Sequence, residues 1–190
     1  MNIITNNCLG GFIYRDILKC EYQNPFIWTG IEIKQFIDLV DNFEKIDFNN
    51  VMIEKKGKDF SNNFYIIIDD KYAVRNVHIY FDANENIPKR KSDGVYYNKP
   101  WEYIYLKYIK RIKKMDKDIR IGFYDKNEST LEDLIKLSEI CKKRKYKCLI
   151  ITDKIIESNE FVKFCYFNHK DPWFDEIKNK YKNEFEWLLK

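Results

Sequence analysis

Short apolar runs alternate with amphipathic segments along this chain, which is the pattern of an α/β protein. Strands are predicted where the apolar runs fall, at residues 3–4, 51–53, 64–68, 74–81, 119–124, 148–152 and 161–167. Helices are predicted where apolar side chains recur every three or four positions, at residues 9–19, 33–43, 101–115, 131–141 and 174–188. We therefore expect one α/β domain over residues 1–190, with three α/β/α layers around a mixed, mostly parallel sheet.

Residue types at the ends of these segments refine the assignment. Thr29 and Glu32 have the spacing of a capping box, and Ser129 or Thr130 caps the helix that follows. The tripeptide 69–71, Asp-Asp-Lys, separates two predicted strands and is typical of a hairpin turn. From residue 119 to 152 the order strand, capped helix, strand has the length of a βαβ unit, which predicts that these two strands are parallel.

Composition narrows the class of protein. With 190 residues, of which 45% are hydrophobic and 17% aromatic, the chain is long and apolar enough to fold around a core. The net charge of +4 is too small to indicate a nucleic-acid partner. Five cysteines without a Cys-x-x-Cys pair indicate reduced thiols in a cytoplasmic protein, and we expect neither a signal peptide nor a membrane span. Because the sequence has no glycine-rich nucleotide loop and no close histidine pair, we expect no cofactor and no metal.

The stretch from Asn2 to Tyr14 combines a short strand, a polar corner and a helix start, with Cys8 at the corner. A cysteine at a helix N-terminus faces unpaired amides and the positive end of the helix dipole, which favours its thiolate. Gly10 and Gly11 allow close approach of the backbone. Cys8 is therefore a candidate nucleophile; the alternative is a small buried residue in a tight turn.

Polar residues also follow other predicted strands. In an open α/β sheet, ligands bind at the carboxyl ends of the strands. The residues expected there to bind substrate are Asn6, Asn7, Asp82, Asp125 and Asp153. An aromatic segment after the first helix adds Trp28, which either lines the same cleft or packs on the core.

Cysteine catalysis also needs a base, and the chain has two histidines, His78 and His169. His169 lies between Asn168 and Lys170 in a polar turn, which suits an acid/base residue, whereas His78 lies in the middle of a predicted strand. We predict Cys8 and His169 as an acyl- or group-transfer pair, with the side-chain amides of the two asparagines before Cys8 and the helix-start amides as oxyanion donors.

The predicted helix 101–115 is amphipathic and strongly basic. Its lysines and arginine occupy the positions between its apolar residues. This pattern is found on surfaces that face a membrane or an anionic polymer, but more often such a face is only solvated. Cations near the end of a helix also complement its dipole.

A family resemblance rests on two segments near the N-terminus. They read Asn6-Asn7-Cys8-Leu9-Gly10-Gly11-Phe12-Ile13-Tyr14 and Tyr22-Gln23-Asn24-Pro25-Phe26. They resemble the opening of a bacterial family of unknown function, numbered 1919 among such domains, whose members begin Ser-Asn-Asn-Cys-Trp-Gly-Gly-x-Ile-Tyr before Tyr-x-Ser-Pro. Leu9 stands in place of the family's Trp, and Asn24 in place of its Ser. The family also has a histidine close to the position of Tyr80, on the strand that carries His78 here. The likeness extends over roughly residues 2–153.

Members of that family are often labelled exopolysaccharide biosynthesis proteins, so the resemblance implies a role in surface-polysaccharide or capsule assembly. We expect either an enzyme that transfers an acyl or other group on a glycan through Cys8, or a non-catalytic protein of the assembly machinery that binds a glycan or a partner. The expected partner is a glycan or sugar-linked substrate, met in the second case at the membrane surface. A looser likeness to papain-like bacterial proteins with an early cysteine favours thiol chemistry.

Overall fold

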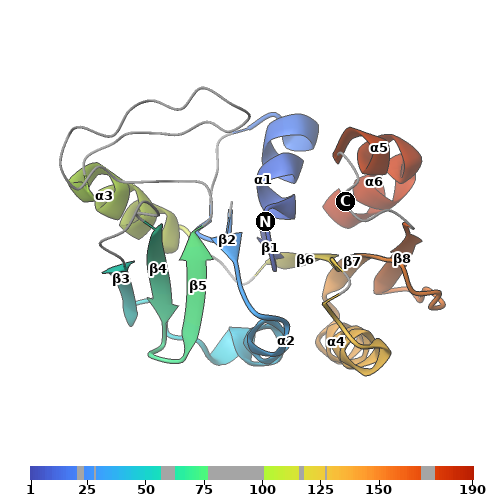
Figure 1. Ribbon diagram of the computed structural model, residues 1–190, viewed down its shortest axis with the longest axis horizontal. Coiled ribbons are helices and arrows are strands. Elements are labelled where there is room, and N and C mark those ends of the chain that lie inside the picture. The colour runs from blue at the N-terminus through green and yellow to red at the C-terminus, as the bar shows by residue number, and fades with distance from the viewer. Residues whose placement is uncertain are drawn as a thin grey trace.

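The computed structural model of the chain describes residues 1–20, 24–27, 29–56, 63–76, 101–115, 118–126, 128–167 and 174–190. Over these residues the chain forms helices and two separate four-stranded sheets (Figure 1). The α/β class predicted from the apolar pattern is confirmed.

The first sheet is entirely parallel. Its strands, in spatial order, are β1 (Asn2–Thr5), β6 (Ile119–Tyr124), β7 (Lys147–Thr152) and β8 (Val162–Tyr166). The stretch from Cys148 to Thr152 is buried throughout. Such continuous burial is expected for a parallel strand, because the crossover helices cover both faces of the sheet.

Helices lie on both sides of this parallel sheet (Figure 1). On one side are α1 (Leu9–Phe12) with the π-helical segment η1 (Ile13–Leu18), α5 (Phe174–Lys180) and α6 (Lys182–Leu189). On the other side are α2 (Ile33–Asn42), which continues into the 3₁₀ turn η2 (Phe43–Lys45), and α4 (Leu131–Arg144).

The second sheet is entirely antiparallel, which corrects the prediction of one mixed sheet. Its strands, in spatial order, are β2 (Thr29–Gly30), β5 (Tyr72–Asn76), β4 (Asn63–Ile68) and β3 (Val51–Lys56). The turn between β4 and β5 spans only residues 69–71, far too few for a parallel crossover. Asp69 and Asp70 adopt positive φ angles of 54° and 51°, the conformation that a tight hairpin turn requires.

The helix ends show which local signals operate. Thr130 and Asp133 form a reciprocal capping box at α4, as the prediction for that helix requires. The capping box predicted at Thr29 and Glu32 is wrong, because Thr29 belongs to β2 and α2 begins after Glu32 without a side-chain cap. The C-terminal helix is divided into α5 and α6 at Tyr181. No helix among the described residues combines the length and the apolar character that crossing a bilayer demands.

The core consists of two clusters, because successive strand residues point to opposite faces of a sheet. Ile3 joins the cluster beneath α1, α5 and α6, whereas its neighbour Ile4 joins the larger cluster on the other face. The larger cluster also contains Phe64 of β4 and Tyr108 of α3 (Trp101–Ile112), whose ring centroids are 5.0 Å apart. The two sheets therefore share one core, and α3 packs against the antiparallel sheet.

Candidate functional site

The corner after β1 is held by the hydroxyl of Thr5. Its Oγ1 donates to the carbonyl of Asn7 at 2.7 Å and accepts the amide of Gly10 at 3.2 Å. A Cβ at position 10 would lie 2.8 Å from Oγ1, so only glycine fits here without displacement. The strand, turn and helix predicted for the opening segment are therefore locked by one side chain.

Asn6 and Asn7 fasten this corner to the end of β6. The side chain of Asn6 accepts from the amide of Tyr124 and donates to its carbonyl, both at 3.0 Å, as though it extended the sheet by one residue. Asn7 donates to the same carbonyl at 2.9 Å and accepts the amide of Leu9 at 3.1 Å. Each of these side-chain amides thus donates one hydrogen bond within the protein, and the helix-start amides of Leu9 and Gly10 have protein acceptors. Their role as oxyanion donors stays a prediction.

Asn24, which was not among the predicted site residues, completes this framework from the second segment of the resemblance. Its fully buried side chain donates to the carbonyl of Ile3 and to the hydroxyl of Tyr14, each at 3.1 Å, and accepts the amide of Phe26 at 2.9 Å. Its position directly before Pro25 was a signal for a turn-stabilising residue, since asparagine bonds its own backbone two residues ahead.

Cys8 lies half-buried directly before α1. Burial raises the pKa of its thiol from 9.0 to about 11; the nearby cation Lys126 and a backbone hydrogen bond lower it by less. The prediction that the helix start would favour the thiolate is wrong, because desolvation outweighs the field of a helix whose regular part is one turn long. At neutral pH the sulfur is a thiol.

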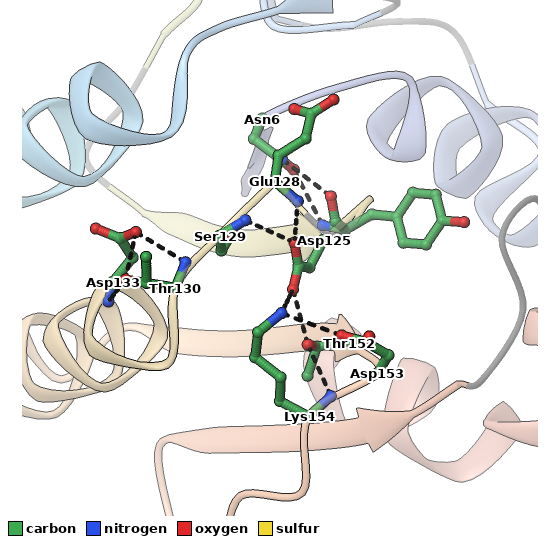
Figure 2. Close-up of polar contacts among 10 residues, drawn as sticks. Asn6, Asp125, Glu128, Ser129, Thr130, Asp133, Thr152, Asp153 and Lys154 are labelled. Atoms are coloured by element: carbon green, nitrogen blue, oxygen red, sulfur yellow. Dashed lines mark hydrogen bonds and ion pairs between the residues drawn. The ribbon is translucent and has the colours of Figure 1, made fainter.

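Asp125 follows β6 and is the centre of a buried polar cluster (Figure 2). One carboxylate oxygen accepts the amides of Glu128 at 3.2 Å and Ser129 at 3.1 Å. The other accepts the hydroxyl of Thr152 and the ammonium of Lys154, both at 2.9 Å. Burial alone would raise the pKa of this carboxyl group, but the hydrogen bonds from Lys154, Thr152 and the Ser129 amide, together with the charge of Lys154, outweigh it and hold the pKa below 3.8.

Lys154 connects this buried cluster to solvent. It also bonds Asp153 at 3.1 Å, and the side chains of Lys154 and Asp153 are 25% and 37% exposed. Although burial by itself would lower the pKa of Lys154, its hydrogen bonds to Asp125 and Asp153 raise it. Asp125 is therefore the interior anchor of the cluster, and the other two residues form its accessible rim.

The structure thus brings together several predicted residues at the carboxyl edge of the parallel sheet. A continuous path of bonds runs from the corner after β1, through the backbone end of β6, to the loop after β7. The predicted residues on this edge are Asn6, Asn7, Cys8, Gly10, Asp125 and Asp153, and Gly11 is buried in α1 beside them.

Four further predicted residues lie outside the described residues. They are Trp28, His78, Asp82 and His169. The pairing of Cys8 with a histidine therefore stays a prediction. The prediction also missed Thr152 and Lys154, although both flank Asp153. The rule that selected Asp153, a polar residue at the end of an apolar strand, applies to these two residues as well.

Among the described residues, no group of three or more His, Cys, Asp or Glu side chains is arranged to hold a metal ion. No protein-family model, curated protein or solved structure matches the chain. The geometry of the carboxyl edge and the resemblance of the opening segment are therefore the two grounds for a functional proposal.

Proposed function

We propose that this protein acts in surface-polysaccharide assembly and binds a glycan or sugar-linked substrate at the carboxyl edge of its parallel sheet. One observation carries the proposal: the Asn-Asn-Cys-x-Gly-Gly segment of the resemblance folds into the corner of that edge and is bonded to the end of β6. Ligands of open α/β sheets bind beside such an edge.

The chemistry of the accessible rim suits sugar hydroxyls. Asp153 offers acceptors, Lys154 offers donors, and Asn7 is half-buried at the same edge. A hydroxyl both donates and accepts, so an adjacent carboxylate and ammonium satisfy it. Asp125 holds Lys154 in place from below, which fixes the donor before a ligand arrives.

Binding without catalysis is the role that the resting site supports best. The thiol of Cys8 is protonated at neutral pH, and the backbone amides of Leu9 and Gly10 are occupied by protein acceptors. These features are those of a rigid binding corner rather than of an activated nucleophile.

A cysteine-dependent transferase is the second candidate, favoured by the position of the half-buried thiol at this same edge. In that case a base removes the thiol proton as Sγ attacks an acyl carbonyl, and the leaving group receives that proton. A sugar hydroxyl then takes the acyl group from sulfur, and its own proton returns through the base to Sγ, which restores the thiol. His169 or His78 would supply the base.

The test is titration of the protein with a panel of oligosaccharides and their acetylated forms, followed by amide NMR. We expect shifts at residues 6–8, 126 and 153–154, and a weaker affinity in Asp153→Asn. The matched control is Asp175→Asn, which removes a surface carboxylate that also bonds a lysine, Lys178 at 2.7 Å. No shifts at millimolar ligand, or equal losses in both variants, would contradict binding at this edge.

The Cys8→Ser variant distinguishes a binding protein from a cysteine-dependent transferase. Cys8→Ser should keep oligosaccharide binding if the corner only binds. If the protein is a transferase, an acyl adduct on Cys8 should appear by mass spectrometry with an acetylated donor and be absent in Cys8→Ser. Cys20→Ser, a change at an exposed cysteine elsewhere, is the control.

A further inference from the structure

A groove of about 580 Å³ lies between Cys20 and one face of α3. The elements that line the groove lead away from the carboxyl edge of the parallel sheet. α1 and η1 begin at that edge and lead away from it to Cys20, and α3 precedes the opposite, amino-terminal end of β6. The described lining of the groove contains no residue of the candidate site above.

The groove is strongly cationic. Its described lining contains four cations and no carboxylate; the cations are Lys107, Lys110, Arg111 and Lys114. The first three belong to α3, where their spacing places them on one side of the helix, and Lys114 lies in the turn directly after it. At helical rise the run from Lys107 to Lys114 spans about 10 Å. This length exceeds one phosphate group and matches a ligand with at least two adjacent anionic groups.

The guanidinium of Arg111 is buried and held in place at the base of the groove. The residue is only 5% exposed, and its guanidinium lies 5.0 Å above the ring of Tyr108, which itself packs on Phe64. A guanidinium held in this way is well suited to phosphate, because its planar donors are already oriented.

The first turns of α3 add an apolar wall. Tyr103 and Leu106 line the groove and are 50% and 65% exposed. The ammonium of Lys107 lies 5.8 Å from the centre of the Tyr103 ring, so a cation and an aromatic face meet within one turn. A ligand that fits this arrangement carries a ring next to its anionic groups.

We propose that the groove along α3 binds a soluble ligand in which a diphosphate is joined to a ring, with the phosphates against the cations and the ring against Tyr103 and Leu106. The proposal is independent of the function proposed for the carboxyl edge. A ring and two phosphates fit within the groove volume.

A membrane surface is the competing source of phosphate, and the geometry disfavours it. A helix that lies on a bilayer presents its exposed apolar side chains on one face. Here Tyr105, 41% exposed, is two residues from Tyr103 and from Lys107, which places it roughly 200° around α3 from both. The concave surface also suits a small ligand better than a flat bilayer.

The test measures binding of uridine 5′-diphosphate, inorganic pyrophosphate and uridine to the full chain by calorimetry. We expect both phosphate compounds to bind, the nucleotide more tightly, and uridine not to bind. Lys110→Gln combined with Lys114→Gln should lower the affinity for both phosphate compounds at least tenfold. Tyr103→Ala should lower the affinity for the nucleotide about fivefold and leave the affinity for pyrophosphate unchanged.

The matched control is Lys142→Gln with Lys143→Gln, which removes the same charge from exposed positions of α4. It should change either affinity less than twofold. Equal losses in both double variants would show attraction by overall charge and overturn the proposal. So would a wild-type protein that binds neither phosphate compound, or one that binds phosphatidylglycerol vesicles but not the diphosphates. All variants should keep the wild-type melting temperature, because the substituted lysines and Tyr103 are exposed.

Discussion

The thiol of Cys8 should react slowly at neutral pH, and the structure indicates how slowly. Burial raises its pKa from 9.0 to about 11, which lowers the thiolate fraction about 100-fold at neutral pH relative to an ordinary thiol. A thiolate of higher pKa is intrinsically more nucleophilic, by roughly six- to tenfold for two units. Together these effects predict disulfide exchange roughly ten- to fifteenfold slower than in an unstructured cysteine peptide, before any steric hindrance.

The assay is exchange with a pyridyl disulfide over a pH series, with each cysteine quantified by peptide mass spectrometry. The rate at Cys8 should rise about tenfold per pH unit until the pH approaches about 11. The exposed Cys20 reports that the reagent is active at each pH. A rate at Cys8 that reaches a plateau below neutral pH, or exceeds that of the peptide, would refute the reasoning and favour an activated nucleophile.

The same raised pKa has a consequence for stability. The folded state holds the thiol proton more tightly than the unfolded state, so this contribution is complete below pH 9.0 and is lost as the pH rises toward about 11. Two units correspond to at most about 2–3 kcal/mol. Urea unfolding of the wild type and of Cys8→Ser should therefore diverge across this window, with the wild type losing more. Parallel curves would contradict the assigned pKa.

Three further predictions concern the framework of the site, each measured by urea unfolding. Asp125→Asn should lower the free energy of unfolding by about 3–5 kcal/mol, because a buried carboxylate that accepts four hydrogen bonds is replaced by a group with one acceptor oxygen. The wild type should also lose this stability as the pH falls below 3.8, and the variant should not. Gly10→Ala should lower the free energy of unfolding by about 1–3 kcal/mol, because the new Cβ would lie 2.8 Å from Oγ1 of Thr5, and by less in a Thr5→Ala background. Equal losses in both backgrounds would refute the clash. Lys145→Gly should stabilise the fold by roughly 0.5–1 kcal/mol, because this residue ends α4 with φ at 58°; a destabilised variant would contradict relief of backbone strain.

Much of the secondary structure could be predicted because its causes are local. The apolar run 119–124 coincides with β6, and the capping signal at Ser129 or Thr130 predicts the start of α4 to within one residue, with Thr130 as the observed cap. The hairpin at residues 69–71 follows from the short turn between two apolar runs. Each of these features depends on residues within a few positions of one another, so the sequence pattern contains the necessary information.

The candidate site was predictable only as a location. Polar residues after β1, β6 and β7 had to meet if the strands were parallel neighbours, and they do. The roles of these residues were not predictable, because their partners are distant in sequence. Asn6 was expected to face a ligand, yet its side chain bonds the backbone of Tyr124, 118 residues away. The ordinary pairing rules for asparagine do not reveal such a partner.

Sequence alone therefore determined most of the helices and strands, and which of the described polar residues share an edge. Tertiary structure decided that the strands divide into a parallel and an antiparallel sheet, and that Thr29 joins a strand instead of capping a helix. It also decided the protonation of Cys8, because burial of its sulfur in the folded chain outweighs the local field of the helix start. Desolvation depends on everything packed around an atom, and no local stretch of residues contains that information.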